Sequence, residues 1–483
     1  MESDKEPSQH TENSLHQDTA GEHIRPAPMR TLGLWSCVAL VIGNILGSGI
    51  FVAPGEVLSL AGTIELALFC WFFSGLVVFL GALCYIELGI MFPHSGADYQ
   101  YLTRAYHPSI GFAYTWMMLL IYFPGSNALL SLTAARYILR MFGEASAQAG
   151  VLLKEKAVAG GICAFITLTN TLQTRYGVIL QGWLAVFKLL FVLLICISSL
   201  GFIFITGIPQ NSAVKEIRPL SFSGIDPLEL GFAFYNALWA YDGWNSVNLA
   251  AGEVVNPAEV LPRATCISIP IIVLCYIAVN LSYMAVLPEK TIRDSRSLVV
   301  DLGTLIYGGP AVKIVASVSV ALIAVGALNG LVLVGARLAQ TCASDALIPK
   351  ALAYLHPTRH TPVAALLFNF ILGCIFIALF SFNSIIRQFM LSTWLFFLLS
   401  TVSVIVFRVR EPKKERPFRV WIVAPVLFAL FALSAVLFPF FSSQAIEAAI
   451  VFGSILLSFP VWLFFHYEHN GHTAASRLCF FCR

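Results

Sequence analysis

The segment Val41-Ile42-Gly43-Asn44-Ile45-Leu46-Gly47-Ser48-Gly49-Ile50-Phe51 lies inside a long apolar run, from Leu32 to Leu58, which is expected to cross a membrane. Two glycines flank a serine at its centre, and glycine both weakens a helix and exposes its backbone. A helix that opens at this point leaves N–H groups on one side of the break and carbonyl groups on the other.

Backbone groups released in hydrocarbon need new partners. A zwitterionic ligand can supply both kinds, because its carboxylate accepts from the N–H groups while its ammonium donates to the carbonyls. The alternative interpretation of the spacing is a small-residue packing face that runs from Gly43 to Gly47.

The composition is that of a polytopic membrane protein. The chain has 483 residues, of which 58% are hydrophobic and only 11% are charged, which excludes a soluble globular chain. We therefore predict an all-α membrane protein with about twelve transmembrane helices. The predicted spans are 32–58, 64–92, 110–135, 157–174, 178–206, 228–250, 265–287, 312–336, 362–381, 388–407, 422–440 and 446–466.

An even number of spans places both termini on the same side of the membrane. The short loop between the tenth and eleventh spans is strongly basic, and the positive-inside rule assigns such a loop to the cytoplasm. Both termini are therefore predicted to be cytoplasmic, with tails at 1–30 and 467–483, the first of them polar and disordered. The basic residues of this loop are Arg408, Arg410, Lys413, Lys414, Arg416 and Arg419.

Lys188 lies deep inside the fifth predicted span. A lysine at the centre of a bilayer costs ~2.5–3.5 kcal/mol on insertion scales, and its side chain reaches water only when an interface is near. We predict a functional charge that joins a broken helix to a neighbouring one, in the place where other carriers hold a sodium ion.

Polar residues interrupt the sixth predicted span, Phe234-Tyr235-Asn236-Ala237-Leu238-Trp239-Ala240-Tyr241-Asp242-Gly243-Trp244-Asn245. Asp242 needs a partner at this depth, and the sequence leaves open Lys188, a cationic substrate side chain or a transported proton. Trp239 lies one helical turn before the acid, where it can cover a small site, although an ordinary packed tryptophan is the alternative.

The two interrupted spans, the first and the sixth, are five spans apart. This pattern is typical of a five-plus-five inverted repeat, in which the substrate binds at mid-membrane between two broken helices. We therefore assign helices 1–5 of the first repeat to residues 31–206 and helices 6–10 of the second to residues 207–410. Residues 411–466 then form two additional helices.

Three further features of the spans bear on the site, and the first two have two interpretations each. Asn329, in the eighth span, is either a site or gate residue or a polar packing contact. Glu87, at the end of the second span, either binds a neighbouring group or lies at the membrane interface. Pro124-Gly125-Ser126 allows a kink in the third span.

Taken together, these motifs resemble the amino acid–polyamine–organocation superfamily and, within it, the L-type light subunits of heteromeric amino acid transporters. The resemblance extends from Leu32 to His466. Within the group, residues 239–245 are most similar to the cystine and dibasic amino acid exchanger, whereas large-neutral exchangers typically lack an acid at Asp242. The motifs are Gly47 to Phe51, Cys84 to Gly89 with Ser95-Gly96 and Tyr99, Trp239 to Asn245, Asn256-Pro257 with Leu261-Pro262, and Arg416-Pro417.

The resemblance implies sodium-independent exchange of cationic or neutral L-amino acids by alternating access in the plasma membrane, with no cofactor and no metal. The roles it implies for single residues follow. Backbone amides at Ser48 and Gly49 hold the substrate carboxylate, with Gly47 beside them in the site. The carbonyls of Ile45, Trp239 and Ala240 hold the amino group, and Asp242 contacts a cationic side chain. Trp239 gates the site, Asn245 supports the broken helix, and Lys188 replaces the sodium ion.

The chain departs from this group at three places. Light subunits usually bind a glycoprotein heavy chain through a cysteine after the third span, but no cysteine lies between Cys84 and Cys163. Either a heavy chain binds without that disulfide or the protein works alone. Asn44 replaces a common threonine, and Phe123-Pro124-Gly125 replaces Lys-Pro-Thr, which favours aromatic or bulky neutral substrates over cystine.

Two other functions remain open on the sequence. One is a proton-coupled amino acid or polyamine carrier, in which Asp242 or Lys188 carries the proton. The other is a membrane scaffold or amino acid sensor that binds ligand without moving it. A membrane enzyme is the function that the sequence favours least, because the chain has no catalytic Ser/His/Asp spacing, no His-Glu-x-x-His motif and no phosphate-binding loop.

Overall fold

A computed structural model describes residues 30–92, 97–143, 149–172, 175–249, 251–344, 347–357 and 361–469. The Ser95-Gly96 pair of the second motif, residues 1–29 of the expected N-terminal tail and residues 470–483 of the C-terminal tail lie outside these ranges. The described residues form helices, and one isolated bridge pairs Leu32 with Val254.

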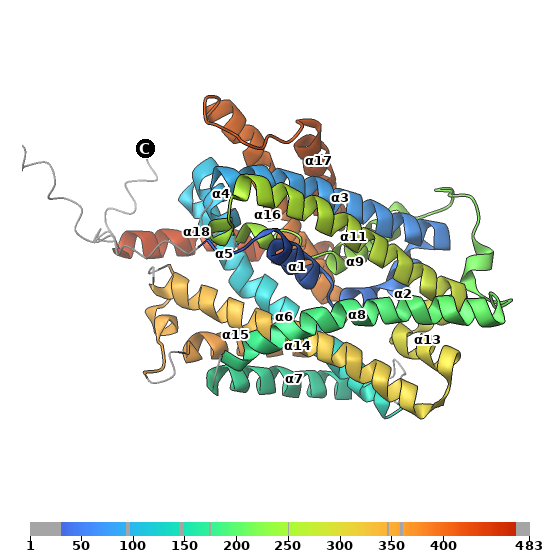
Figure 1. The fold of residues 1–483 in the computed structure, drawn as a ribbon. Helices are drawn as coiled ribbons and strands as arrows, with labels where there is room; N and C mark the ends of the chain where they lie inside the picture. Colours follow the sequence, from blue (N-terminus) through green and yellow to red (C-terminus); the bar gives the residue numbers. More distant parts are fainter. Residues whose placement is uncertain are drawn as a thin grey trace, which may run out of the picture.

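Several of the longer helices, among them α3, α8, α11 and α14, run across the view in a similar direction (Figure 1). The first two, α1 and α2, and the later α9 lie near the middle of the bundle. The main helices are α1 (Leu34–Ile45), α2 (Gly49–Ala61), α3 (Ile64–Met91), α4 (Ala97–Ala105), α5 (Pro108–Met117), α6 (Phe123–Met141), α7 (Ala149–Leu172), α8 (Arg175–Thr206), α9 (Pro227–Ala240), α10 (Ser246–Leu249), α11 (Pro257–Val286), α12 (Glu289–Asp294), α13 (Leu298–Tyr307), α14 (Gly309–Ser344), α15 (Val363–Leu379), α16 (Phe382–Arg410), α17 (Val423–Leu437) and α18 (Ala445–His469).

Among the described residues, eight helical segments are long and apolar enough to cross a membrane, and the bent pair α1–α2 makes a ninth. Helices also lie over the other three predicted spans, but these do not meet the same criterion. Of the three, α9 has 14 residues and α15 has 17, while α7 carries Lys154, Glu155 and Lys156 near its start. The structure is therefore a multi-span helical membrane protein, and the number twelve stays a prediction.

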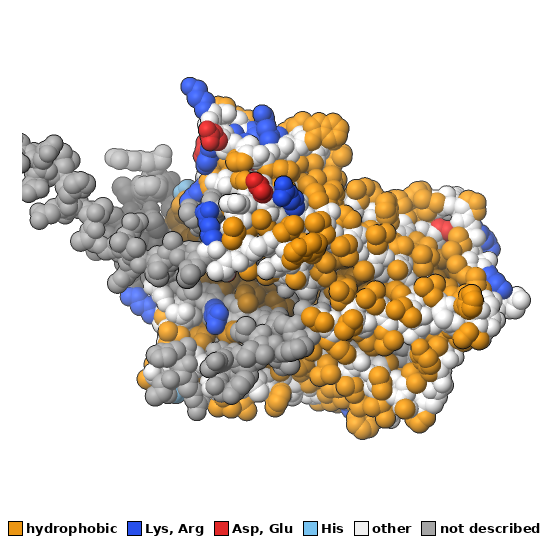
Figure 2. All heavy atoms as spheres, in the orientation of Figure 1, with side chains coloured by type: hydrophobic (Ala, Val, Ile, Leu, Met, Phe, Trp, Pro, Cys, Tyr) orange, Lys and Arg blue, Asp and Glu red, His pale blue; other side chains and the backbone are white. Residues whose placement is uncertain are grey.

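The surface along the helices matches a lipid environment. On α8, Leu190, Leu194, Ile197 and Leu200 are more than 40% exposed and follow each other at helical spacing along one face. Figure 2 shows hydrophobic side chains over the flank of the bundle, with charged side chains gathered toward its two ends. An apolar surface of this extent indicates burial in hydrocarbon.

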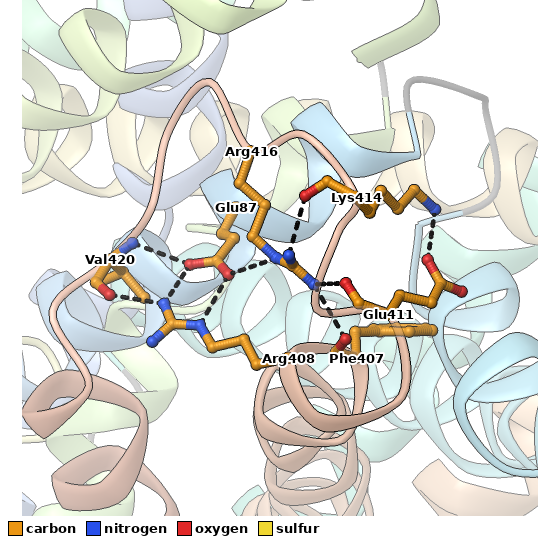
Figure 3. Close-up of polar contacts among 7 residues, drawn as sticks. All are labelled: Glu87, Phe407, Arg408, Glu411, Lys414, Arg416 and Val420. Atoms are coloured by element: carbon orange, nitrogen blue, oxygen red, sulfur yellow. Dashed lines mark hydrogen bonds and ion pairs between the residues drawn. The ribbon is translucent and has the colours of Figure 1, made fainter.

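Glu87, for which the sequence allowed either a partner or an interfacial position, is fully buried and has partners (Figure 3). Its Oε1 accepts from Arg408 Nε at 3.0 Å, and its Oε2 accepts from the backbone N–H of Val420 at 2.8 Å. The Arg416 guanidinium lies 3.6 Å from Oε1 and donates to the carbonyl of Phe407. This cluster attaches the loop after α16 to the end of α3.

Part of the basic loop is therefore structural. Arg408 and Arg416 bind Glu87, and Arg410 donates to the backbone carbonyl of Ala105 at 2.6 Å. Charge that is neutralised or bound to backbone in this way contributes to the fold, and its effect on the orientation of the chain in the membrane stays a prediction.

Candidate functional site

The first span is broken where the glycines predicted. Helix α1 ends at Ile45 and α2 begins at Gly49, and their axes are bent by 50°. A Cβ at Gly49 would lie 2.7 Å from Cα of Ala240 on α9, whereas one at Gly47 would meet nothing closer than 3.7 Å. Gly49 is thus needed for close contact between the two interrupted spans.

The second interruption lies directly opposite. Helix α9 ends at Ala240, and a turn leads to the short helix α10 at Ser246. Gly243, in this turn, has φ +97°, a backbone conformation that favours glycine. A Cβ there would lie 3.3 Å from the backbone of Asn44, so the two breaks touch each other.

A cavity of about 90 Å³ lies between the breaks. One water molecule needs roughly 10–15 Å³ of such cavity volume. The cavity therefore has room for several water molecules or a small solute. Its walls come from α1, α2, α6, α9, the turn after α9, α14 and α16. The lining residues are Asn44, Ile45, Gly47, Ser48, Gly49, Ser126, Leu129, Leu130, Trp239, Ala240, Asp242, Ala327, Leu331 and Phe389.

The backbone around the cavity is complementary to a zwitterion. The N-terminus of α2, at Gly49, presents N–H groups that have no partner inside the helix and favours an anion. The C-termini of α1 and α9, at Ile45 and Ala240, present carbonyls and favour a cation. The buried Ser48 hydroxyl at this junction also has no hydrogen-bond partner among the described residues.

Tyr276 of α11 is a member of this site that the sequence analysis did not identify. Its fully buried hydroxyl lies 2.8 Å from the carbonyl oxygen of Ile45 and 2.7 Å from that of Ala240. These are two of the three carbonyls assigned to the substrate amino group. A tyrosine in an apolar helix carries no signal of such a contact, because packing alone brings α11 to the two breaks.

Asp242 lines the cavity, and its Oδ2 accepts a hydrogen bond of 2.9 Å from the hydroxyl of Tyr122. Lys188 was one of the three partners that the sequence left open for Asp242, and the structure does not pair the two residues. The buried Lys188 ammonium instead lies 3.4 Å from the carbonyl oxygen of Gly43, in α1. This contact joins α8 to the first broken span, and the role of Lys188 as a substitute for a sodium ion stays a prediction.

Tyr122 reaches Asp242 from a wide turn in the third span. Residues Met118–Tyr122 form a π-helical turn between α5 and α6, just before Pro124. Proline has no N–H and displaces the carbonyl four residues earlier, which a wider turn accommodates. The expected kink is therefore a change of helical pitch, after which Ser126 faces the cavity.

Trp239 forms part of the cavity wall and is half-buried. Its ring lies nearly perpendicular to that of Phe382 at 5.6 Å, and the Arg136 guanidinium lies 4.6 Å from the other ring. Trp239 therefore contacts the cavity on one side and Phe382 on the other, a position from which its large side chain can cover the cavity. The role of a gate stays a prediction.

Three predicted site residues do not line the cavity: Lys188, described above, Asn329 and Asn245. Asn329 lies on α14 between the cavity residues Ala327 and Leu331, and its Oδ1 accepts from Asn170 of α7 at 2.8 Å. This is the polar packing contact that the sequence left as the alternative. Asn245 lies at the end of the turn after α9, where its carbonyl accepts from the N–H of Asn248. Within the described ranges, no three His, Cys, Asp or Glu residues lie together as metal ligands.

The fold and the cavity define a multi-span membrane protein with a small binding site between two broken helices, where polar helix ends meet. The amino acid permease family matches residues 32–465 of the chain. The b(0,+)-type amino acid transporter 1 of Homo sapiens is 34% identical over 443 residues, which is 91% of this chain and 88% of the relative. The large neutral amino acids transporter small subunit 2 of Mus musculus is 30% identical over 451 residues, 91% and 82% of the two chains.

The chain therefore belongs to the amino acid permease family. It is an amino acid transporter and not an enzyme, as the sequence predicted, and it is related to both of these transporters.

Proposed function

We propose that the chain is a sodium-independent exchanger that carries cationic and neutral L-amino acids by alternating access. The observation that carries this proposal is the meeting of three helix ends at one cavity: the N-terminus of α2 and the C-termini of α1 and α9. One end favours an anion and two favour a cation, in the arrangement that an α-amino acid needs.

In the proposed complex, the substrate carboxylate accepts from the backbone N–H groups of Ser48 and Gly49, beside Gly47. The substrate ammonium donates to the carbonyls of Ile45, Ala240 and Trp239. The N–H donors at the start of α2 have no intrahelical partner, so the ligand takes bonds that the helix itself does not use.

The substrate side chain is proposed to lie toward α6 and α16. The walls there are mostly apolar, with Leu129, Leu130 and Phe389, which accommodates a neutral side chain. Asp242 adds a single acid at the edge of this space, and its Oδ2 already accepts from Tyr122. A carboxylate has further lone pairs, so it can also accept from a cationic side chain.

Lys188 supports the absence of a sodium requirement. Its ammonium lies 3.4 Å from the carbonyl of Gly43 in α1 and is buried. A fixed charge there can stabilise the carbonyl end of a broken helix in every step of the cycle, as a bound sodium ion would. Trp239 is proposed to cover the site, and Asn245 to support the turn after α9.

Alternating access is proposed to use two inverted repeats, residues 31–206 and 207–410. The two broken spans, α1–α2 and α9–α10, then begin one repeat each. We propose further that the protein lies in the plasma membrane with both termini in the cytoplasm. A heavy chain, if one binds, does so without the usual disulfide, because the first cysteine after Cys84 is Cys163, which is fully buried in α7.

Reconstitution of the purified chain tests the exchange. Liposomes are loaded with arginine, with leucine or with no amino acid, and uptake of labelled arginine and leucine is measured without sodium. Uptake that requires an internal amino acid supports exchange, and it also shows that the chain works without a heavy chain. Uptake into empty vesicles driven by a pH gradient identifies a proton-coupled carrier instead. Binding of both amino acids without any transport supports the sensor.

Asp242→Asn tests the assignment of substrate charge. Asparagine keeps an oxygen that accepts from Tyr122 but removes the charge. One charge-assisted hydrogen bond of ~1.5–3 kcal/mol corresponds to a rise of about 10- to 150-fold in KM for arginine, while KM for leucine stays unchanged.

Asp226→Asn is the matched control. Asp226 precedes α9 and caps it through the N–H of Leu228 at 2.8 Å, away from the cavity. This variant should transport arginine as the wild type does. If Asp242→Asn also does so, Asp242 does not select the substrate.

A further inference from the structure

Another cavity, which we call the lateral groove, lies outside the substrate site. It measures about 230 Å³, more than twice the volume of about 90 Å³ between the broken helices. Its walls come from α8, α13 and α14, which pack against one another toward one end of the bundle (Figure 1). The lining residues are Phe191, Leu194, Ile195, Ser198, Val299, Leu302, Gly303, Ile306, Tyr307, Ala311, Val312, Val315 and Ala316.

The lateral groove opens on the apolar flank of the bundle. Leu194 on the α8 wall is 53% exposed, and Val315 on the α14 wall is 61% exposed. Leu194 also belongs to the exposed apolar face of α8 that matches a lipid environment. A molecule that enters the groove therefore comes from the hydrocarbon of the membrane and not from water.

One polar contact interrupts the apolar lining. The hydroxyl of Tyr307, the last residue of α13, donates to Oγ of Ser198 on α8 at 2.7 Å. Each hydroxyl has one proton and two lone pairs, so the Tyr307 oxygen can still accept and the Ser198 hydroxyl can still donate. This pair is complementary to a single hydroxyl group on a lipid.

The Tyr307–Ser198 pair lies at one end of the lateral groove. Ser198 is near the end of α8 at Thr206, whereas Phe191 lies at the deeper end of the groove, one helical turn after Lys188. Along the axis of α8, Phe191 and Ser198 are about 10 Å apart. This length is comparable with the fused rings of a sterol and is shorter than the acyl chain of a phospholipid.

The residue types of the walls also favour a sterol over a phospholipid. Among the described residues that line the lateral groove, none carries a charge that could bind a phosphate headgroup. Gly303 on α13 and Ala311 and Ala316 on α14 have little or no side chain, so these two walls are smooth. Smooth apolar walls with one polar end suit a flat, rigid molecule that has one hydroxyl.

Contacts behind the walls hold the lateral groove in shape. Asp301 of α13 forms an ion pair of 2.5 Å with Arg140 of α6. Phe191 packs edge-on against Phe51 of α2, with ring centroids 5.7 Å apart. A preformed groove and a rigid ligand both lose little conformational freedom on binding.

We propose that the lateral groove binds a sterol from the surrounding membrane. The sterol hydroxyl lies on the Tyr307–Ser198 pair, and its rings extend between α8 and α14 toward Phe191. Through Phe191 the bound sterol supports α2, the helix that begins at the break in the first span. The site takes a lipid, so its existence does not depend on the proposed exchange of amino acids.

Photolabelling of the purified full chain in detergent tests the site. A photoactivatable cholesterol analogue is the probe, and the labelled residues are identified by mass spectrometry. We expect labels on α8, α13 or α14 that excess cholesterol displaces and excess phosphatidylcholine does not. Epicholesterol, which differs from cholesterol only in the configuration of its hydroxyl, should displace the probe about fivefold less well, the worth of one hydrogen bond.

Tyr307→Phe removes one hydroxyl of the polar pair and should abolish the preference for cholesterol over epicholesterol. Its matched control is Tyr354→Phe, because Tyr354 is similarly exposed, at 55% against 62%, and does not line the groove. This control should keep the preference.

Val315→Trp fills the lateral groove with a large ring and should reduce labelling by at least about tenfold. Val318→Trp adds the same ring one helical turn later on α14, at an exposed position that does not line the groove. This second variant should be labelled as the wild type is.

The sterol site is wrong if the labels lie only on other helices, or if phosphatidylcholine displaces the probe as well as cholesterol does. It is also wrong if Val315→Trp keeps wild-type labelling, or if Val318→Trp loses as much labelling as Val315→Trp. An unchanged preference between the two sterols in Tyr307→Phe contradicts the role of the polar pair. A chain that is labelled in the groove but exchanges no amino acid contradicts the proposed function alone.

Discussion

Glu87→Gln should destabilise the protein far more than the loss of one surface charge. Glu87 is fully buried, and the side chains of its two partners, Arg408 and Arg416, are only 9% and 7% exposed. Glutamine has nearly the same shape but no charge, so the two guanidinium groups are left without a counter-charge (Figure 3). The backbone N–H of Val420 keeps an acceptor oxygen within reach.

The size of the effect follows from this burial. Removing one partner of a buried ion pair costs about 3–5 kcal/mol, because a charge remains buried without compensation. Glutamine keeps the Val420 hydrogen bond and nearly the same side-chain volume. We therefore expect Glu87→Gln to lower the free energy of unfolding by ~3 kcal/mol, near the lower end of this range. Glu87→Ala should cost more, because it also removes the acceptor for this N–H.

The assay is thermal unfolding of the purified full chain in detergent, followed by loss of the monodisperse peak. We expect Glu87→Gln to lower the apparent melting temperature by about 5 °C or more. The control is Glu411→Gln in the same loop, because Glu411 and Lys414 form an ion pair at 2.9 Å with side chains 42% and 36% exposed. An exposed pair is worth ~0–1 kcal/mol. Equal shifts for the two variants would refute the reasoning that burial makes the Glu87 cluster strong.

Two further predictions concern the broken helices. Gly49→Ala should reduce uptake by at least about tenfold, because a Cβ 2.7 Å from the Ala240 backbone forces α2 and α9 apart. Gly33→Ala is the control, because a Cβ at the N-cap of α1 has no neighbour within 4 Å, and this variant should retain uptake. Equal uptake by both variants would contradict the close-contact argument. Lys188→Met should lower exchange by about tenfold at equal surface expression, since the Gly43 carbonyl loses its charged donor; wild-type exchange in liposomes would show that this charge is dispensable.

The break in the first span was predictable because its cause is local. Two glycines around Ser48 in a hydrophobic run weaken a helix wherever it lies, so the sequence alone predicts an opening in this stretch. The structure places it between the end of α1 at Ile45 and the start of α2 at Gly49. The acid at Asp242 is likewise conspicuous in a membrane span. Both features point to the cavity without knowledge of how the helices pack.

The remaining site residues depend on packing and on the angle around each helix. Tyr122 comes from the third span, where Pro124-Gly125-Ser126 predicts a kink but not which side chain faces the site. Tyr276 comes from α11, which is continuous from Pro257 to Val286. Asn329 is misleading for a geometric reason, because residues 327 and 331 share one face of α14, while residue 329 points about 200° away from the first of them. Which of these two faces meets the cavity is decided by neighbouring helices, and the polar residue lies on the other one.

The π-helical turn at Met118–Tyr122 affects how this chain should be aligned with its relatives. Such a turn holds one residue more than the α-helical turn that it replaces. A relative without the extra residue would carry an ordinary α-helix, with every side chain before this point rotated by about 100° relative to those after it. The alignment gap therefore belongs inside the helix, at residues 118–122, and not in a neighbouring loop. With the gap misplaced, Tyr122 would be matched to a residue that faces another direction.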